Sequence, residues 1–296
     1  MDVQWYPGQM AKAKRVLREN LKLVDAVIEV LDARLPASSR NPDIREILER
    51  RPVVAVLTRP DLADPSQTAA WLHSLREDYF AVVAANGSTG EGIKKLLQLL
   101  RTLPRRRKHG QRPLRLIIIG IPNVGKSSLI NRLIGRSATQ TGDKPGITKQ
   151  PQWVRLQAGL ELLDTPGMLW PKISCKKQAF RLAAAGAVKD EILDPVELGI
   201  ELLSFMRRHF WQQLQQRYGL ENSAAGAREI LADIAKRRGC LLKGGAVDLE
   251  AASRLFVKDL REGRLGRITL EKPGEQEDEA EELCQDDGRG DLLLTE

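Results

Sequence analysis

A glycine-rich segment followed by lysine and serine carries the clearest chemical signal in the sequence. Gly120 is separated by four residues from Gly125, Lys126 and Ser127. This spacing matches G-x-x-x-x-G-K-[ST], in which backbone N–H groups surround phosphates, the lysine reaches the β and γ oxygens, and the hydroxyl binds Mg²⁺. The apolar run 116–119 precedes the loop and a helical pattern follows it, as a strand, phosphate loop and helix require. An ordinary turn between a strand and a helix is the alternative.

Two later segments supply groups that could complete a phosphate and magnesium site. Asp164 ends the predicted strand 160–163, where a carboxylate can hold Mg²⁺ through water, and the Gly167 N–H can meet a γ-phosphate. Thr148, in a polar and turn-rich loop, is the hydroxyl best placed to reach Mg²⁺. The segment DTPG could instead be only a turn, but its distance from the phosphate loop favours the site.

A third group of residues could read a nucleotide base. Asp61 follows the predicted strand 52–57, at the carboxyl edge where α/β sheets bind ligands. Taken by itself, an aspartate in this position is more often a helix cap. Asn86 and Gly87 form a similar polar loop after the strand 79–84. Ordinary GTPases have such elements after the phosphate loop and here they precede it, which indicates a circular permutation.

Hydrophobic patterns predict the elements that position these residues. Strands and helices alternate up to residue 163, which predicts an α/β domain with a mostly parallel sheet. Beyond Pro171 only helical patterns occur, so an all-helical region should follow. We expect strands at 25–32, 52–57, 79–84, 115–119, 152–156 and 160–163. Early helices should occur at 9–22, at 42–50, centred on 71–75, at 92–100 and after the phosphate loop, and C-terminal helices at 195–218, 230–238 and 248–263. The predicted domains are 1–175, 176–271 and an acidic, disordered tail at 272–296.

The charge distribution suggests a polyanionic partner. The chain of 296 residues has a formal net charge of +8 and a hydrophobic content of 42%. Residues 272–296 hold ten acidic and two basic residues, a net charge of −8, so residues 1–271 carry +16. Such a basic body is typical of proteins that bind nucleic acid, although solvated lysine and arginine on helix faces could account for it.

Cysteine use and hydropathy favour a cytoplasmic protein. Three widely spaced cysteines argue against both a disulfide framework and a zinc site. The three histidines are scattered and suggest no metal site or catalytic pair. No apolar run approaches the length of a membrane span, and the N-terminus lacks the apolar core of a signal peptide. We therefore expect no membrane association.

Taken together, these motifs resemble the ribosome biogenesis GTPase A family, circularly permuted GTPases that help to mature the large ribosomal subunit. The resemblance covers residues 1 to about 270. It implies a P-loop GTPase domain followed by an all-helical RNA-binding domain, GTP and GDP as ligands, the large subunit and its rRNA as partners, and a monomeric chain. It rests on WYPGQMAKA (5–13), GIPNVGKSSLINRL (120–133), TGDKPGIT (141–148), DTPGMLWPK (164–172) and KRRGCLLKGG (236–245).

The resemblance assigns site residues by position. It implies guanine contacts from Thr58, Arg59, Asp61, Asn86 and Gly87. It implies phosphate contacts from Asn123, Val124, Gly125, Lys126, Ser127, Ser128, Thr148 and Gly167. Mg²⁺ would be held by Ser127, Thr148 and, through water, Asp164, and a K⁺ ion by Asn123. RNA contacts would come from Lys236, Arg237, Arg238 and Lys243, although cations in a last helical turn also stabilise the helix dipole.

Two departures from the family pattern affect the expected activity. The base-reading motif Asn-Lys-x-Asp is replaced by Thr58, Arg59, Pro60 and Asp61, so guanine recognition should survive through Asp61 with weaker binding. Gln9 replaces a histidine implicated in hydrolysis, and either orients the attacking water or merely caps a helix. Hydrolysis should therefore be slow and be stimulated by large subunits. An RNA-binding placeholder with little GTPase activity and a small-molecule kinase are the alternatives.

Overall fold

The computed structural model describes most of the chain. It covers residues 7–40, 47–48, 51–104, 112–135, 152–156, 159–164, 176–188 and 193–274. For residues 7–13, 152 and 164 the description is limited to the backbone. The predictions for Thr148, Gly167 and the tail beyond residue 274 therefore fall outside the described residues.

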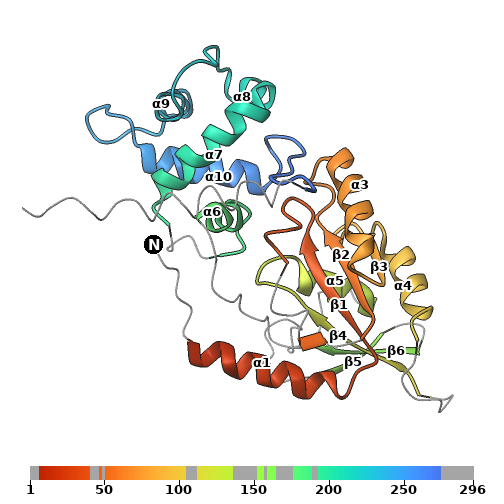
Figure 1. The fold of residues 1–296 in the computed structure, drawn as a ribbon. Helices are drawn as coiled ribbons and strands as arrows, with labels where there is room; N and C mark the ends of the chain where they lie inside the picture. The colour runs from red at the N-terminus through yellow and green to blue at the C-terminus, as the bar shows by residue number, and fades with distance from the viewer. Residues whose placement is uncertain are drawn as a thin grey trace, which may run out of the picture.

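A mostly parallel sheet forms the centre of the N-terminal part (Figure 1). Within the described residues its strand order is β3-β2-β1-β4-β6-β5, and only β5 runs antiparallel to its neighbour. Every residue of β1 is buried, as expected of a central strand covered on both faces. The strands are β1 (Ala26–Asp32), β2 (Val53–Thr58), β3 (Ala81–Ala84), β4 (Leu114–Ile119), β5 (Gln152–Leu156) and β6 (Leu160–Asp164). The predicted fold class and the six strands are confirmed.

Helices cover both faces of this sheet. On one face Leu17 of α1 (Pro7–Leu21) packs in a cluster with Ile117, and Trp71 of α3 (Pro65–Ser74) packs in a cluster with Leu57. The short 3₁₀ helix η1 (Leu75–Glu77) follows α3. The opposite face is covered by α4 (Ile93–Arg101) and α5 (Lys126–Ile134). These layers do not cover the end of the sheet at which the carboxyl ends of the parallel strands lie, which we call its carboxyl edge.

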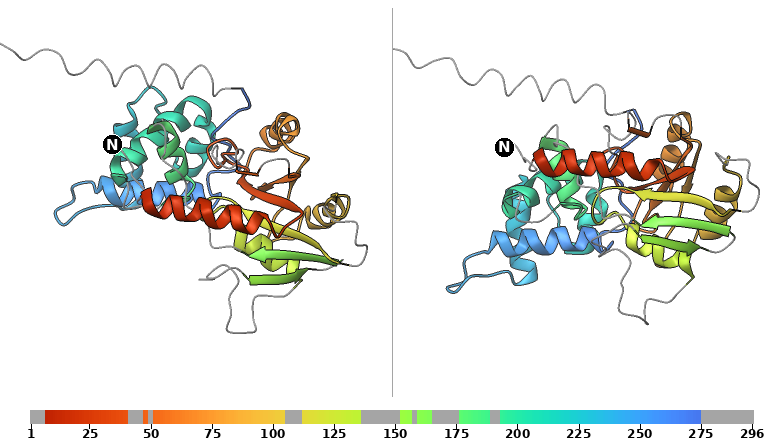
Figure 2. Two further views of the ribbon diagram at one scale, coloured as in Figure 1. Left: turned by 60° about the horizontal axis from the view of Figure 1, so that its bottom comes forward. Right: turned by 90° about the horizontal axis from the view of Figure 1, so that it is seen from below.

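Helices alone follow the last strand in the described part of the chain. They gather beside the sheet rather than over one of its faces, and Figure 2 shows the same arrangement from two other sides. A single cluster of buried residues runs from Val30 and Ile118 in the sheet to Leu203 and Phe256 in these helices. The helices are α6 (Lys176–Ala184), α7 (Pro195–His209), α8 (Trp211–Tyr218), α9 (Ala227–Arg238) and α10 (Leu249–Arg261).

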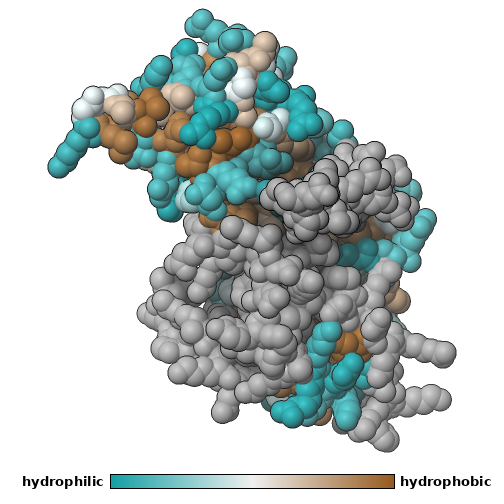
Figure 3. Space-filling view, turned by 60° about the vertical axis from the view of Figure 1, so that its left-hand side comes forward, coloured by the Kyte–Doolittle hydropathy of each residue, from teal (hydrophilic) through white to brown (hydrophobic). Residues whose placement is uncertain are grey.

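The surface of the helical part carries some apolar side chains among its polar ones (Figure 3). Leu241 and Leu242, in the loop after α9, are 49% and 53% exposed. Among the described residues, no helix combines the length and apolarity needed to cross a membrane.

One predicted helix is wrong, because the segment 195–218 forms two helices. Asp194 caps α7 as expected, accepting the Glu197 N–H at 2.8 Å, with Pro195 in the first turn. At Phe210 the backbone leaves the helical region (φ −141°, ψ 38°), and α8 begins at the next residue. The break lets the Phe210 ring pack against Phe205, with ring centroids 5.9 Å apart. Apolar spacing continues through the break, so the periodicity did not reveal it.

After α10 the chain makes a turn and returns to the sheet as a segment without helix or strand, which we call the C-terminal strap (residues 263–271). Ile268, Thr269, Leu270 and Glu271 of this strap are buried. The Leu270 N–H donates to the carbonyl of Arg34 at 2.7 Å. The strap therefore connects the end of the helical part to the carboxyl edge of the sheet.

Candidate nucleotide-binding site

The phosphate-loop motif forms a tight turn between β4 and α5. Gly120 lies so close to β1 that an added Cβ would be 2.6 Å from the Val30 carbonyl oxygen. Gly125 adopts φ 95°, a conformation that favours glycine, and directly precedes α5. Both glycines of the motif are therefore required by the geometry. α5 begins at Lys126, directly after this turn, and backbone N–H groups at a helix N-terminus are a common place for an anion to bind.

Lys126 is the cation of this loop. Its ammonium group donates to the carbonyls of Gly120 and Ile121, each at 2.6 Å. These bonds hold the side chain along the loop that would surround the phosphates. Ser127 and Ser128 follow in the first turn of α5 and are exposed. A hydroxyl at the position of Ser127, together with phosphate oxygens, suits the oxygen preference of Mg²⁺.

The base-reading candidates lie together at the same edge of the sheet. Asn86 is buried, and its amide donates to Asp61 Oδ1 at 2.7 Å. Its own Oδ1 accepts the N–H groups of Ser88 and Thr89, at 2.8 and 3.0 Å, which fixes the loop. Asp61 itself is exposed. Asp64 caps α3, accepting the N–H groups at the start of that helix, so the helix-cap interpretation of Asp61 is wrong.

The two residues that replace the asparagine and lysine of the base-reading motif both contact the phosphate loop. The buried hydroxyl of Thr58 lies 3.0 Å from the Leu31 carbonyl and 2.5 Å from that of Val124. Arg59 donates to the carbonyl of Asn123 at 2.7 Å. The base-reading loop is thus fixed against the phosphate loop even though the asparagine and lysine are replaced.

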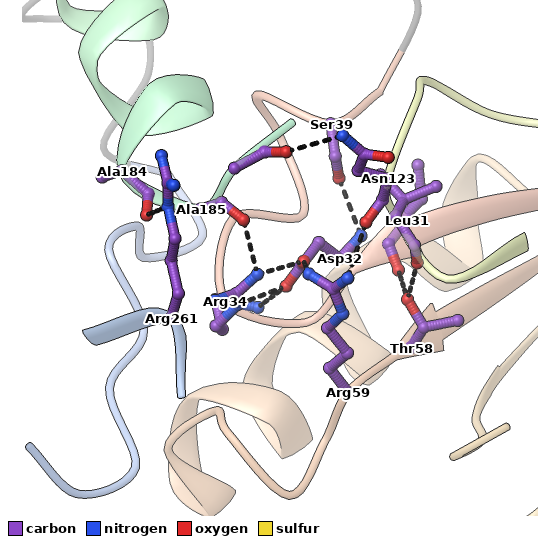
Figure 4. A network of polar contacts seen from close by, with 12 residues as sticks. Leu31, Asp32, Arg34, Ser39, Thr58, Arg59, Asn123, Ala184, Ala185 and Arg261 are labelled. Atoms are coloured by element: carbon purple, nitrogen blue, oxygen red, sulfur yellow. Dashed lines mark hydrogen bonds and ion pairs between the residues drawn. The ribbon is translucent and has the colours of Figure 1, made fainter. Parts of the chain in front are cut away.

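A buried ion-pair network lies beneath these loops, at the end of β1 (Figure 4). Asp32 accepts Nε and Nη2 of Arg34, at 2.9 and 2.7 Å, and Nη1 of Arg59 at 3.2 Å. Burial raises the pKa of Asp32, but the charge and hydrogen bonds of Arg34 outweigh this effect and leave that pKa below its ordinary value. Asp32 therefore remains ionised and holds both arginines in place.

The same network reaches the C-terminal end of α6. Arg34 Nη2 donates to the Ala185 carbonyl at 3.1 Å, and the amide of Asn123 donates to the Gly186 carbonyl at 3.0 Å. Arg261 of α10 donates to the carbonyls of Ala183 and Ala184, at 2.6 and 3.2 Å. Helix ends leave such carbonyls without intrahelical partners. Here the donors come from the loop after β1, the phosphate loop and α10.

Known proteins resemble this chain over most of its length. Residues 115–217 match a family model described as 50S ribosome-binding GTPase. Ribosome biogenesis GTPase A of Bacillus cereus is 42% identical over 293 residues, which cover 96% of this chain and 99% of that protein. The chain belongs to the ribosome biogenesis GTPase A family. It is therefore a GTPase, as both the sequence motifs and the fold indicate.

Less similar relatives and a solved structure agree with this assignment. Ribosome biogenesis GTPase A of Thermotoga maritima is 35% identical over 271 residues, covering 92% of this chain and 95% of that protein. Mitochondrial ribosome-associated GTPase 1 of Bos taurus is 34% identical over 304 residues, covering 94% and 91%. The GNP-bound structure of YlqF from T. maritima matches with a TM-score of 0.65 and 30% identity, covering 89% of this chain and 99% of that one.

Four predicted site residues lie outside the described side chains. Gln9 lies in the first turns of α1 and Asp164 is the last residue of β6, each with only its backbone described. Thr148 and Gly167 lie outside the described residues. The described residues contain no group of three or more histidine, cysteine or acidic side chains that could hold a metal ion by themselves.

The predicted RNA-binding residues lie at the end of α9 and in the loop after it. Arg237 pairs with Asp233 at 3.0 Å, and Arg238 donates to the Arg217 carbonyl at 2.6 Å. The side chains of Lys236 and Lys243 are exposed and make no hydrogen bond or ion pair with any other described residue. The two lysines are therefore the more accessible cations of the four.

Sequence reasoning missed Asp32, Arg34 and the C-terminal strap as parts of this site. The available signal was a charged pair, Asp32 and Arg34, at the end of the apolar strand 25–32, where ligands bind in α/β sheets. A charged pair so close to the end of a buried strand is unusual and indicates a buried network. For the strap no local signal existed, because its contacts are distant in sequence.

Gly87 provides a direct test of the second base-reading loop. A Cβ at this position would lie 2.6 Å from the backbone carbon of Ser128 and 2.7 Å from the backbone nitrogen of Leu129. Gly87→Ala should therefore lower the free energy of unfolding by about 1–3 kcal/mol and weaken GTP binding, because the loop must move away from α5. Urea unfolding and nucleotide titration measure the two effects. Gly226→Ala, where the nearest neighbour of the Cβ is 3.9 Å away, is the control and should leave GTP affinity unchanged.

Proposed function

We propose that this GTPase is an assembly factor for the large ribosomal subunit, which binds rRNA or the pre-ribosome with GTP and is released after hydrolysis. The proposal is supported by the names of its relatives and of its family model, Ribosome biogenesis GTPase A and 50S ribosome-binding GTPase. The net charge of +16 on residues 1–271 agrees with an RNA-rich partner.

The contact between Asp61 and Asn86 is the observation that best supports guanine as the base. One oxygen of the Asp61 carboxylate accepts the Asn86 amide at 2.7 Å, which orients the side chain at the exposed edge beside the phosphate loop. A carboxylate there can accept the N1 and N2 hydrogens of guanine, whereas adenine offers no donor at N1. Gly87 brings the second loop against the start of α5, and Arg59 would cover the face of the base with its stem.

The phosphate site would use the loop from Asn123 to Ser128. Its backbone N–H groups would contact the phosphates, and Lys126 would exchange its loop carbonyls for the β and γ oxygens. Ser127 and Thr148 would bind Mg²⁺ directly and Asp164 through water, while the Gly167 N–H would contact the γ-phosphate. The ion would neutralise charge developing on the phosphates during transfer to water.

Asn123 and Gln9 would have two further roles, which are binding of a K⁺ ion and orientation of the attacking water. The amide nitrogen of Asn123 donates to Gly186, so its oxygen is the atom that would bind K⁺. Gln9, near the start of α1, would orient the water by hydrogen bonding but could not accept its proton as an imidazole could. Slow hydrolysis in the absence of the ribosome follows from this. The family assignment favours an active GTPase over an RNA-binding placeholder.

Hydrolysis with purified subunits tests the proposal. Large subunits should raise the turnover number about 10²-fold or more, because a partner can complete the groups around the γ-phosphate, and small subunits should not. Equal rates with either subunit, or with none, would contradict the proposal.

Gln9→Ala in the same assay should reduce the stimulated rate, and an unchanged rate would remove Gln9 from the mechanism.

Charge reversals separate the ribosome contact from the chemistry. The double variant Lys236→Glu, Lys243→Glu should lose stimulation by large subunits while its basal rate is unchanged. Both lysines are exposed, and α9 lies among the C-terminal helices, away from the sheet (Figure 1). Lys94→Glu, Lys95→Glu makes the same charge change on the exposed side of α4 and is the matched control. If both pairs lose stimulation equally, the effect comes from net charge and not from the α9 loop.

A further inference from the structure

The C-terminal strap binds the backbone of the base-reading loop. Arg267 donates to two carbonyls, from Nη2 to Pro60 at 2.7 Å and from Nε to Ala63 at 3.0 Å. The N–H of Ile268 donates to the carbonyl of Leu62 at 2.9 Å. Three carbonyls of the four residues 60–63 thus accept hydrogen bonds from the strap.

These bonds bracket Asp61, whose carboxylate is the proposed base reader. The Pro60 carbonyl directly precedes Asp61 in the chain, and those of Leu62 and Ala63 follow it. The Leu62 N–H also closes the turn by donating to the Arg59 carbonyl at 3.0 Å. From the other side Asn86 holds the Asp61 carboxylate itself. The strap therefore fixes the backbone of Asp61 while Asn86 fixes its side chain.

The strap is anchored without Arg267. The Glu271 carboxylate is buried and accepts the N–H groups of Ala37 and Ser38, at 2.8 and 3.1 Å. Its backbone carbonyl accepts the Trp71 indole N–H at 3.1 Å. Thr269 Oγ1 accepts the Asp64 N–H at 3.0 Å. Because these contacts remain when residue 267 is changed, the strap should keep its path in an Arg267 variant.

We propose that Arg267 is a positioning residue for base recognition, which acts through the backbone on both sides of Asp61. The planar guanidinium suits this role, because two of its donors can reach two carbonyls at once. Lysine carries a similar charge but has a single nitrogen on a flexible stem. The inference rests on the proposed function, since it requires Asp61 to read guanine.

The test compares nucleotides that differ in the base. GDP offers donors at both N1 and N2, the inosine analogue IDP lacks the 2-amino group, and ADP has no donor at N1. Loss of Arg267 should loosen Asp61, so Arg267→Ala should reduce the preference for GDP over IDP about tenfold, as expected when hydrogen bonds to a charged group are weakened. Dissociation constants for the three diphosphates, measured on the full chain by calorimetry, provide the ratio. Arg267→Lys should recover only part of it.

The matched control is Arg264→Ala, three residues earlier in the strap. Arg264 donates to Asp259 at 2.9 Å and has no hydrogen bond to the base-reading loop, so its loss should leave the ratio unchanged. A general structural defect would weaken GDP, IDP and ADP by the same factor, which would overturn the inference. If wild type does not distinguish GDP from ADP, the assignment of Asp61 fails first. If wild type distinguishes GDP from ADP but Arg267→Ala and Arg267→Lys both keep the full preference for GDP over IDP, only the role of Arg267 is excluded.

Discussion

Lys126→Ala should abolish detectable binding of guanine nucleotides at micromolar protein concentration. The affinity should fall by at least about 100-fold, which corresponds to ~3 kcal/mol of binding free energy. The ammonium group is the cation of the phosphate loop, where it lies 2.6 Å from the carbonyls of Gly120 and Ile121. The phosphates of the nucleotide bring negative charge to this loop. Alanine has neither a positive charge nor a hydrogen-bond donor to compensate for it. Titration with a fluorescent GDP analogue measures the loss.

The variant should remain folded, which makes the binding result interpretable. Lys126 is only partly buried and donates to carbonyls of a loop beside solvent, so its removal leaves groups that water can reach. Thermal unfolding should therefore change little. Lys95→Ala on the exposed side of α4 removes the same charge elsewhere and should bind normally. Retained affinity in Lys126→Ala would show that the phosphates bind at another place.

Asp32→Asn should lower the free energy of unfolding by about 3–5 kcal/mol at pH 7. Asp32 is buried and accepts hydrogen bonds from both Arg34 and Arg59. Asparagine removes the negative charge and presents an amide N–H to one of the guanidinium groups. The buried Arg34 is then left without its counter-ion. Urea unfolding at pH 7 measures the loss.

The pH dependence gives an independent check on the role of Asp32. Its pKa is lowered in the folded protein, so the stabilisation is present above its ordinary pKa of about 4 and is lost as the pH falls through the lowered value. The difference between wild type and Asp32→Asn should therefore shrink on acidification. Asp233→Asn, which breaks the exposed pair with Arg237, should cost only about 0.3–0.5 kcal/mol. Equal losses in the two variants would contradict the argument.

A double-mutant cycle separates the ion pair from other effects of burial. Arg34→Met removes the cation and keeps an apolar stem of similar length. When both substitutions are combined, the loss should be smaller than the sum of the single losses, because neither Asp32 nor Arg34 is then left as a buried charge without the other. Additive losses would indicate that Asp32 and Arg34 act separately.

The sequence predicted the parts of the fold that local patterns determine. The run of isoleucines at 117–119 is apolar without alternation, so the buried strand β4 could be predicted together with the loop that follows it. The Asp194 cap of α7 was equally local. The break at Phe210 was missed because apolar spacing continues on both sides of it. Periodicity reports which face is buried but not whether the backbone stays helical.

Only the site residues that belong to recognisable sequence motifs were predicted. The Gly120 loop and Asp61 were identified by their residue types, and the structure brings them to one edge of the sheet. The partners that orient them were not identified. Arg267 contacts a carbonyl 207 residues earlier in the chain, and Arg34 contacts one 151 residues later. Hydrogen bonds to backbone carbonyls place no constraint on the residue type at the acceptor, so neither contact leaves a pattern in the sequence.

The hydrophobic cluster that joins the sheet to the C-terminal helices has a consequence for folding cooperativity. Val30 of β1 and Phe256 of α10 belong to one continuous set of packed residues. Cutting the chain after residue 175 would divide that set and expose apolar surface on both fragments. Each Å² of apolar surface exposed to water costs about 25 cal/mol of free energy. Neither fragment would keep its full core. The two parts, although separate in sequence, should therefore melt together as one calorimetric unit.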